Sequence, residues 1–278
     1  DKRQKYYRYQ LNNKILKFTA SPERKKFENE AKFISKYGLS IFPYSFQFNY
    51  EKDKIKLRYE DGYPCFNYNG KTLYLPKSMP EEKAKAYAND ILMEQDPESP
   101  HQYANSIFAI DQQDILLDIG CGDANFSLEN IDKVKTAFLF ESEQKWEIPL
   151  QKTFAPWQNK VHRFNKRVGF GKGEVNLSEM SELENEFVIF KIDVDGAERE
   201  VLKMIDPLLP KLKSAKVAIC TYHQNQDAEE FEQWFKSRGF QTGFEKGYML
   251  FHPDSQIKKP FFRPGVLFAY RAEESKGN

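Results

Sequence analysis

The stretch Asp114-Ile-Leu-Leu-Asp-Ile-Gly-Cys-Gly-Asp-Ala-Asn-Phe126 decides the fold of this chain. Its apolar run, Ile115 to Ile119, is typical of a buried parallel strand, because such strands are apolar on both faces. The run ends in a turn with Gly120 and Gly122, and helix-compatible sequence follows from Asn125. Glycine permits a sharp turn and lets a ligand approach the backbone. Because ligands bind at this end of a strand in open α/β sheets, the stretch predicts a cofactor site.

The residues of the turn indicate which cofactor the site takes. A dinucleotide fingerprint needs a third glycine where Asn125 stands, and the carboxylate of Asp118 would repel a pyrophosphate. The same carboxylate suits a ligand with an ammonium and a sulfonium, such as S-adenosylmethionine. The form Asp118-Ile-Gly-Cys-Gly122 resembles the first motif of class I methyltransferases. The predicted cofactor residues here are Asp118, Gly120, Gly122, Asp123, Asn125 and Phe126; a plain turn after a core strand is the alternative.

The composition excludes several classes of partner. The 278 residues include 42 basic and 41 acidic side chains, with a net charge of +1. This balance provides no overall attraction to nucleic acid or to anionic membranes. The three cysteines are far apart in the sequence and form no C-x-x-C, as expected of a reduced, intracellular protein. No apolar stretch approaches the roughly 18 residues that a membrane span needs. We expect a cytoplasmic protein without nucleic-acid or membrane partners.

From about residue 106 onward, strand-like and helix-like segments alternate. This alternation predicts a doubly wound, mostly parallel α/β sheet of seven strands, closed by an antiparallel terminal hairpin. The expected strands are 115–119, 137–141, 161–165, 187–192, 217–222, 248–252 and 266–271, with helices over 125–134, 144–154, 197–205 and 227–238. Residues 168–177 are glycine-rich and strand-like where a crossover helix would be usual.

Residues 1–105 show no regular alternation of strands and helices and are expected to form an appendage to the domain of residues 106–278. A helix is expected to end near Gly38, followed by strand-like runs over 44–50 and 55–59. Asn69-Gly70 predicts a β-hairpin that continues to Leu75, and a second helix should extend to about Met93. The polar segment 94–103 is either a linker or a lid that brings His101 and Tyr103 to the cofactor crevice.

Two residues at the ends of the next strands are further candidates for the cofactor site. Glu141 ends the second strand of the domain, where an acid can accept hydrogen bonds from ribose hydroxyls; Glu143 is the near alternative. Asn165 ends the third strand at the same edge of the sheet and could border the adenine.

The most distinctive stretch is Phe190-Lys-Ile-Asp-Val-Asp-Gly-Ala-Glu-Arg-Glu-Val-Leu202. Asp193, Asp195 and Glu198 follow a buried strand, and carboxylates placed there need a cation or hydrogen-bond donors. One interpretation is that Asp195 and Glu198 stabilise the start of the following helix. Another is a divalent metal such as magnesium, held by Asp193, Asp195 and His223. Carboxylate spacing alone does not define a metal site, so the sequence favours a site without metal.

This stretch carries a resemblance to a known family. Lys191-Ile-Asp-Val-Asp-Gly-Ala-Glu198, followed by Val201-Leu202, resembles the K-I-D-V-E-G-A-E signature of the FkbM family of S-adenosylmethionine-dependent methyltransferases. The resemblance covers roughly residues 112–245. Phe140-Glu-Ser142 lacks the proline of the family's F-E-P, and Thr221-Tyr-His223 keeps the histidine but not the acid of its Glu-x-His. The resemblance implies a Rossmann-like class I methyltransferase fold and O-methylation of a hydroxyl on a sugar or natural product.

Methyl transfer to a hydroxyl requires alignment of donor and acceptor and a base that takes the proton. Histidine has a suitable pKa, so His223 is the predicted base and Asp193 is the competing one. The expected acceptor is a small molecule or a glycan, and a homodimer is left open. The rival functions are an NAD-dependent oxidoreductase and a non-catalytic binding module with the same fold.

Overall fold

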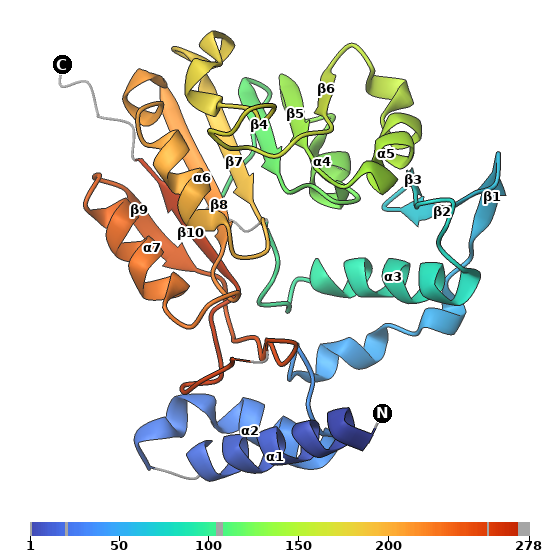
Figure 1. The fold of residues 1–278 in the computed structure, drawn as a ribbon, viewed down its shortest axis with the longest axis vertical. Coiled ribbons are helices and arrows are strands. Elements are labelled where there is room, and N and C mark those ends of the chain that lie inside the picture. Colours follow the sequence, from blue (N-terminus) through green and yellow to red (C-terminus); the bar gives the residue numbers. More distant parts are fainter. Residues whose placement is uncertain (1, 20–21, 104–107, 255, 272–278) are drawn as a thin grey trace.

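The computed structural model describes residues 2–19, 22–103, 108–254 and 256–271, and a seven-stranded sheet lies at its centre (Figure 1). Its strands in chain order are β4 (Asp114–Ile119), β5 (Thr136–Phe140), β6 (Val161–Phe164), β7 (Phe187–Ile192), β8 (Ser214–Cys220), β9 (Gln241–Phe244) and β10 (Val266–Tyr270). Across the sheet their order is β6-β5-β4-β7-β8-β10-β9. Strands β4 to β8 are parallel, and β10 runs antiparallel to both β8 and β9. The predicted doubly wound, mostly parallel sheet of seven strands is confirmed.

The strand order creates a crevice at the carboxyl edge of the sheet. Strand β4 pairs with β5 on one side and with β7 on the other. The chain therefore leaves the carboxyl ends of these strands toward opposite faces of the sheet, and ligands of such sheets bind at this switch point. The loops after β4, β5 and β7 are those that carry the predicted site residues.

Helices cover both faces of the sheet (Figure 1). On one face lie α4 (Asn125–Asn130) and α5 (Glu147–Thr153), and on the other α6 (Glu198–Ile205) and α7 (Asp227–Lys236). Successive strand residues point to opposite faces: Leu116 packs in the core shared with α4 and α5, whereas Leu117 packs in the core shared with α6 and α7. This two-sided burial explains why β4 and β5 have no polar alternation.

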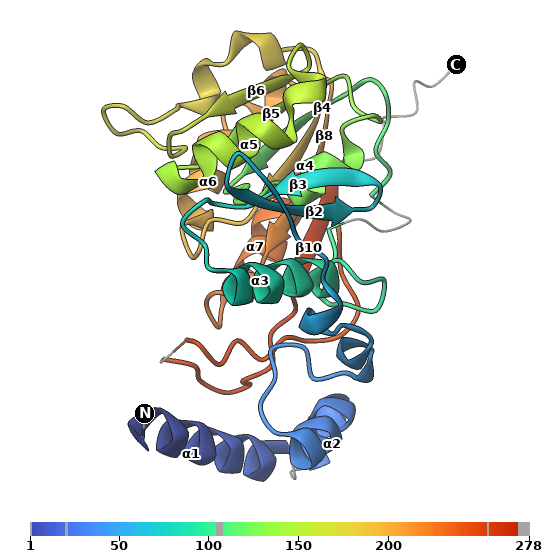
Figure 2. The same ribbon diagram turned by 90° about the vertical axis from the view of Figure 1, so that its right-hand side faces the viewer.

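The N-terminal region adds three helices and a small sheet. The hairpin of β2 (Tyr63–Tyr68) and β3 (Lys71–Tyr74), with β1 (Arg58–Glu60) beside β2, forms an antiparallel sheet. Together with α3 (Glu81–Glu94) it shares the hydrophobic core of the α4 and α5 face. Helices α1 (Lys2–Thr19) and α2 (Glu28–Tyr37) lie at the far end of the molecule (Figure 2). They enclose a separate core that includes Phe27, Leu250 and Phe262.

Several local predictions were wrong. Residues 44–50 contain a 3-10 helix, Ser45–Asn49, in place of a strand. The sixth strand of the sheet is β9, whereas residues 248–252 form only an isolated bridge, Met249 to Arg263, and pack through Leu250 on the N-terminal helices. The glycine-rich segment 168–177 forms one bridge, Val168 to Val175, and no strand. Helix α4 ends at Asn130, and α1 was not predicted.

The predicted boundary between residues 105 and 106 falls among residues 104–107, outside the described part of the chain, and so remains a prediction. No helix within the described ranges has both the length and the apolar character needed to cross a membrane.

Candidate active site

The turn after β4 is held in a left-handed backbone conformation. The φ angles of Gly120 and Gly122 are 72° and 54°, a region that glycine enters at little cost. A Cβ built on Gly120 would lie 1.9 Å from the carbonyl oxygen of Asp193. The amides of Gly120 and Cys121 both donate to the carbonyl of Phe140, at 2.9 and 3.1 Å. Gly120 is therefore required by the close approach of the β4 and β7 loops.

The carboxylate of Glu141 closes this turn from the neighbouring strand. Its Oε2 accepts a hydrogen bond of 2.9 Å from the amide of Gly122, and its Oε1 accepts one of 2.6 Å from the amide of Glu143. Glu141 follows β5 directly, so the parallel register of β4 and β5 brings it beside the glycine turn. The predicted proximity of Glu141 to the turn is thus present in the structure.

A cleft of about 640 Å³ opens above these loops, and we call it the donor cleft. Of the predicted residues, Gly120, Gly122, Glu141, Asp193 and Asp195 line it. Its charged lining residues are the acids Glu141, Glu143, Asp193, Asp195 and Glu200 and the bases Lys145, Lys166 and Arg167. Acids therefore outnumber bases by five to three along its wall.

Asn165 does not line the donor cleft. It lies with Glu141 and Glu147 in a neighbouring cavity of about 210 Å³. Its side-chain amide is 3.4 Å from Glu147 Oε2, a long hydrogen bond. The residues after β6 that reach the donor cleft are Lys166 and Arg167, one and two positions further along.

Asp118 lies beneath the glycine turn and is fully buried. Its Oδ2 accepts a hydrogen bond of 2.6 Å from Ser127 Oγ, and its Oδ1 is 3.1 Å from Lys191 Nζ. Burial would lower the pKa of Lys191, but the negative charges of Asp118 and Asp193 outweigh burial and raise it. Asp118 thus neutralises Lys191 beneath the turn and does not line the donor cleft.

Asp123, Asn125 and Phe126 also build the turn and do not line the donor cleft. Asp123 accepts hydrogen bonds from Tyr87 Oη at 2.6 Å and from the amide of Asn125 at 2.9 Å, and burial raises the pKa of Asp123 to about 6. Asn125 Oδ1 is 2.6 Å from the amide of Phe126. The ring of Phe126 is buried against Tyr103. Tyr87, which comes from α3, was not predicted as a neighbour of the turn.

Asp193 lies among several polar side chains at the carboxyl edge of the sheet. Its Oδ2 accepts a hydrogen bond of 2.7 Å from Tyr103 Oη, and its Oδ1 lies 3.6 Å from His223 Nε2. Burial would raise the pKa of Asp193, but the charges of Lys191 and His223 and the hydrogen bond from Tyr103 outweigh it and hold the pKa at about 2. Asp193 is therefore a carboxylate at neutral pH.

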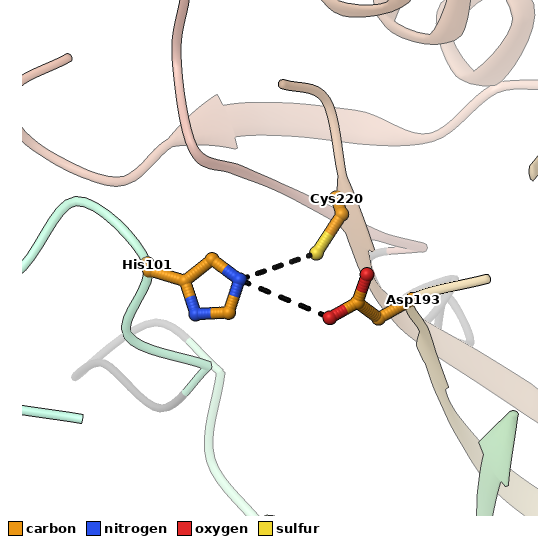
Figure 3. A group of neighbouring side chains, drawn as sticks. All are labelled: His101, Asp193 and Cys220. Atoms are coloured by element: carbon orange, nitrogen blue, oxygen red, sulfur yellow. Dashed lines mark hydrogen bonds and ion pairs between the residues drawn. The ribbon is translucent and has the colours of Figure 1, made fainter. Parts of the chain in front are cut away.

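The segment 94–103 reaches this carboxylate through Tyr103 and His101, neither of which lines the donor cleft. His101 is buried, and its Nε2 is 3.2 Å from Tyr222 Oη and 3.3 Å from Tyr103 Oη. Figure 3 shows the same nitrogen facing both Cys220 and Asp193, at 3.7 and 3.8 Å. Burial lowers the pKa of His101 to about 4. His101 is thus a neutral ring inside a hydrogen-bonded cluster.

His223 stands among carboxylates. Its Nδ1 is 3.0 Å from Glu198 Oε1, and its Nε2 is 3.5 Å from Asp195 Oδ1. Burial would lower the pKa of His223, but Asp195, Glu198 and Asp193 together raise it to about 10. The ring carries a proton at neutral pH and has no free capacity to accept another. This electrostatic environment argues against His223 as the general base and leaves Asp193.

The two remaining acids of the signature behave differently. Glu198 is fully buried, and its Oε1 accepts hydrogen bonds of 3.2 Å from the amides of Val194 and Gly196, in the loop before α6. Asp195 has a φ of 50°, and its side chain is fully exposed. Stabilisation of the start of α6 thus applies to Glu198, whereas Asp195 points into solvent beside His223.

A second cavity of about 410 Å³, which we call the outer cavity, adjoins the donor cleft. Its lining residues are Asp195, Gly196, His223, Gln224, Phe251, Pro253 and Asp254. Asp195 and Gly196 line both spaces. The loop after β7 therefore separates two spaces that meet at Asp195, beside Asp193 and His223.

Comparison with known proteins found no matching family model and no matching curated protein. Among solved structures, the chain is similar to the methyltransferase FkbM from Methylobacillus flagellatus KT, with 15% identity, a TM-score of 0.45, and coverage of 70% of this chain and 56% of that one. Precorrin-6y C5,15-methyltransferase from Geobacter metallireducens GS-15 has 12% identity, a TM-score of 0.42, and coverage of 72% and 94%. The 23S rRNA methyltransferase ErmE has 12% identity, a TM-score of 0.41, and coverage of 60% and 65%.

Proposed function

We propose that this protein is an S-adenosylmethionine-dependent methyltransferase that transfers the methyl group to a hydroxyl of a small molecule or glycan. The observation that carries the proposal is the convergence of the Gly120–Gly122 turn, Glu141 and Asp193 on one cleft at the switch point of the sheet. Each of the three comes from a different strand end.

The donor cleft fits such a cofactor in size and charge. A volume of about 640 Å³ is within the usual range for small-molecule sites. The excess of acids over bases on its wall favours a cationic ligand over the pyrophosphate of a dinucleotide. Glu141 is suited to accept hydrogen bonds from ribose hydroxyls, because its carboxylate already faces the cleft beside the Gly122 amide. These features favour S-adenosylmethionine over NAD.

Bound S-adenosylmethionine supplies a methyl group on a positively charged sulfur. The protein then has to align the acceptor and take up the proton of its hydroxyl. Asp193 is the candidate for proton acceptance, because it is ionised and lines the donor cleft next to the outer cavity. The outer cavity, with Phe251 and Gln224 in its wall, offers an apolar ring and an amide for a hydroxylated acceptor.

Calorimetry of the full chain with S-adenosylhomocysteine tests the donor site. Removing the charge of Glu141 with Glu141→Gln should weaken binding about 10-fold or more, because hydrogen bonds to charged groups contribute about 1.5–3 kcal/mol. The matched control is Glu143→Gln, which alters a neighbouring acid of the same cleft and should change binding less than about 3-fold. NADH should not bind. Absence of S-adenosylhomocysteine binding, or binding of NADH in its place, would refute the proposal.

A further inference from the structure

The charge of this chain is distributed unevenly along it. Helix α1 carries six basic side chains and no acidic one. Since α1 contributes +6 to a whole-chain net charge of +1, the remainder of the chain carries −5. Helix α1 also lies at the end of the molecule far from the sheet (Figure 2). The protein therefore has a basic end and an acidic remainder, which the overall balance of charge conceals.

Lysines from three segments gather around the C-terminal end of α1. Phe18 of α1 and Phe27, which directly precedes α2, are neighbours, with ring centroids 6.1 Å apart. The ammonium nitrogen of Lys259 lies 5.7 Å from the centroid of Phe18, and that of Lys26 lies 4.9 Å from the centroid of Phe27. Their sequence neighbours add further exposed lysines. We call this set of five exposed residues the basic cluster: Lys17, Lys25, Lys26, Lys258 and Lys259.

Two acids at this end of the molecule are already paired with other cations. Glu28 of α2 lies 2.6 Å from Lys32, and Asp254 lies 2.6 Å from the buried Arg263. Like charges held together on a surface create a local potential that attracts partners of opposite charge. The basic cluster therefore favours an anionic partner.

Exposed aromatic rings accompany these lysines. Tyr6 and Tyr9 of α1 are 64% and 65% exposed. With Lys17 they are spaced three and eight residues apart, which places all three on one side of the helix. The opposite side is buried through Leu11 and Ile15. Tyrosine rings beside lysines are typical of the interface between the headgroups and the hydrocarbon of a bilayer.

The kind of cation favours a lipid surface over a nucleic acid. Every member of the basic cluster is a lysine, a compact point charge on a flexible stem, whereas arginine is preferred for recognition of nucleic acids. Clusters of basic residues bind anionic headgroups through their summed charge and need no fixed geometry. The apolar side of α1 packs in the core that includes Leu250 and Phe262. The helix is therefore suited to lie on the headgroups and not to insert its apolar side.

We propose that α1 and the basic cluster dock this protein on an anionic phospholipid bilayer. The lysines attract the headgroups, the rings of Tyr6 and Tyr9 enter the interfacial layer, and the acidic remainder of the chain faces away from the membrane. The proposal concerns a surface remote from the donor cleft and does not rest on the methyltransferase proposal.

The test is co-sedimentation of the full chain with vesicles of phosphatidylcholine that contain about 30% phosphatidylglycerol, an anionic lipid. Vesicles of phosphatidylcholine alone serve as the neutral comparison. We expect binding to the anionic vesicles to be at least about 10-fold tighter than to the neutral ones. Raising the salt concentration from about 0.1 M to about 0.5 M should weaken it strongly, because salt screens exposed charges.

Variants locate the binding surface. Removing three charges of the basic cluster should weaken binding to the anionic vesicles at least about 10-fold, in the variant Lys17→Gln, Lys26→Gln and Lys259→Gln. The matched control removes three exposed lysines of the acidic remainder and should change binding less than about 3-fold, in the variant Lys83→Gln, Lys203→Gln and Lys213→Gln. In this control Lys213 also lies over an aromatic ring, that of Phe187. Circular dichroism shows whether each variant keeps its fold.

Three outcomes overturn the proposal. The first is equal binding to anionic and neutral vesicles, including no binding to either. The second is an equal loss in the two triple variants, which would make net charge responsible and not the basic cluster. The third is tighter binding to a single-stranded RNA of mixed sequence than to the vesicles, which would assign the surface to nucleic acid. Vesicle binding needs no nucleoside, so its failure leaves the result of S-adenosylhomocysteine calorimetry unaffected.

Discussion

Tyr103 donates a hydrogen bond of 2.7 Å to Asp193, and this bond ties the segment before the sheet to the carboxyl end of β7. The two residues are 90 positions apart in the chain. The phenol ring also packs edge-on against Phe126, next to the glycine turn. One tyrosine therefore links the loops after β4 and β7 to the chain that leads into the sheet.

Replacing Tyr103 by phenylalanine should destabilise the protein, because a bond to a buried carboxylate is lost while the ring stays. We expect a loss of about 1.5–3 kcal/mol in urea unfolding at pH 7. Tyr222→Phe is the matched control: Tyr222 lies in the same cluster, but its hydroxyl contacts the neutral His101. The loss in free energy of unfolding for Tyr222→Phe should be about 0.5–1.5 kcal/mol. Equal losses in the two variants would contradict the role assigned to the Asp193 contact.

The buried pair of Asp118 and Lys191 should be sensitive to removal of one charge. Asp118→Asn leaves the Lys191 ammonium buried without its main counter-ion, and breaking such a pair costs about 3–5 kcal/mol. Urea unfolding measures the loss. The control is Glu51→Gln, which breaks an exposed pair with Lys54 and should change stability by less than about 1 kcal/mol. The double variant Asp118→Asn with Lys191→Met should recover part of the loss, since it removes the unpaired charge.

Gly120 should not tolerate a side chain. Alanine at this position would place its Cβ 1.9 Å from the Asp193 carbonyl and adopt a φ of 72°. We expect Gly120→Ala to lower the melting temperature by more than about 10 °C, because a clash with backbone adds to the cost of the left-handed conformation. It should also abolish S-adenosylhomocysteine binding. Gly243→Ala on β9, where nothing lies within 4 Å of the added atom, should leave both properties nearly unchanged.

Glu94, the last residue of α3, should make stability depend on pH. Burial raises its pKa from 4.5 to about 8, and the negative charges of Asp123 and Asp193 contribute. The folded state therefore holds a proton that the unfolded state has lost, so stability falls as the pH rises from about 4.5 to about 8. Glu94→Gln removes this titration and an unfavourable charge at a helix C-terminus.

The melting temperature of Glu94→Gln should exceed that of the wild type by an amount that grows between pH 5 and pH 9. Glu98→Gln, in an exposed turn four residues later, should show no such growth. A constant difference between Glu94→Gln and the wild type across this range would contradict the raised pKa.

Local patterns were sufficient to predict the centre of the sheet. Strands β4 and β7 are mostly apolar runs, interrupted by Asp118 and Lys191, that end in turns or acids, so the meeting of the glycine turn with Asp193 followed from parallel topology. Strand β9 was missed because Gln241-Thr-Gly-Phe is short and polar. It forms a strand because it pairs with β10 at the edge of the sheet. Residues 248–252 resembled a strand because they are apolar, but Leu250 is buried in the core of the N-terminal helices.

The electrostatics of the site depended on contacts between distant residues. Asp118 and Lys191 are register partners on adjacent strands, and only that pairing shows that the carboxylate is already neutralised. The state of His223 likewise depends on Glu198, which the sequence suggested only as a helix-stabilising acid. Single-residue chemistry favoured histidine as the base, whereas the three carboxylates around it make the ring a cation.

The core formed by α1, α2 and the segment around Phe262 adjoins the wall of the outer cavity. In that wall, Asp254 is held by Arg263 at 2.6 Å, and Leu250, which packs on the N-terminal helices, immediately precedes Phe251. If the outer cavity binds the acceptor as proposed, substitutions in this core should alter acceptor selectivity from positions remote from the donor cleft. Deleting the first 27 residues would remove the helices that support this wall but leave the glycine turn intact. Binding of the donor should therefore persist while discrimination between acceptors is lost.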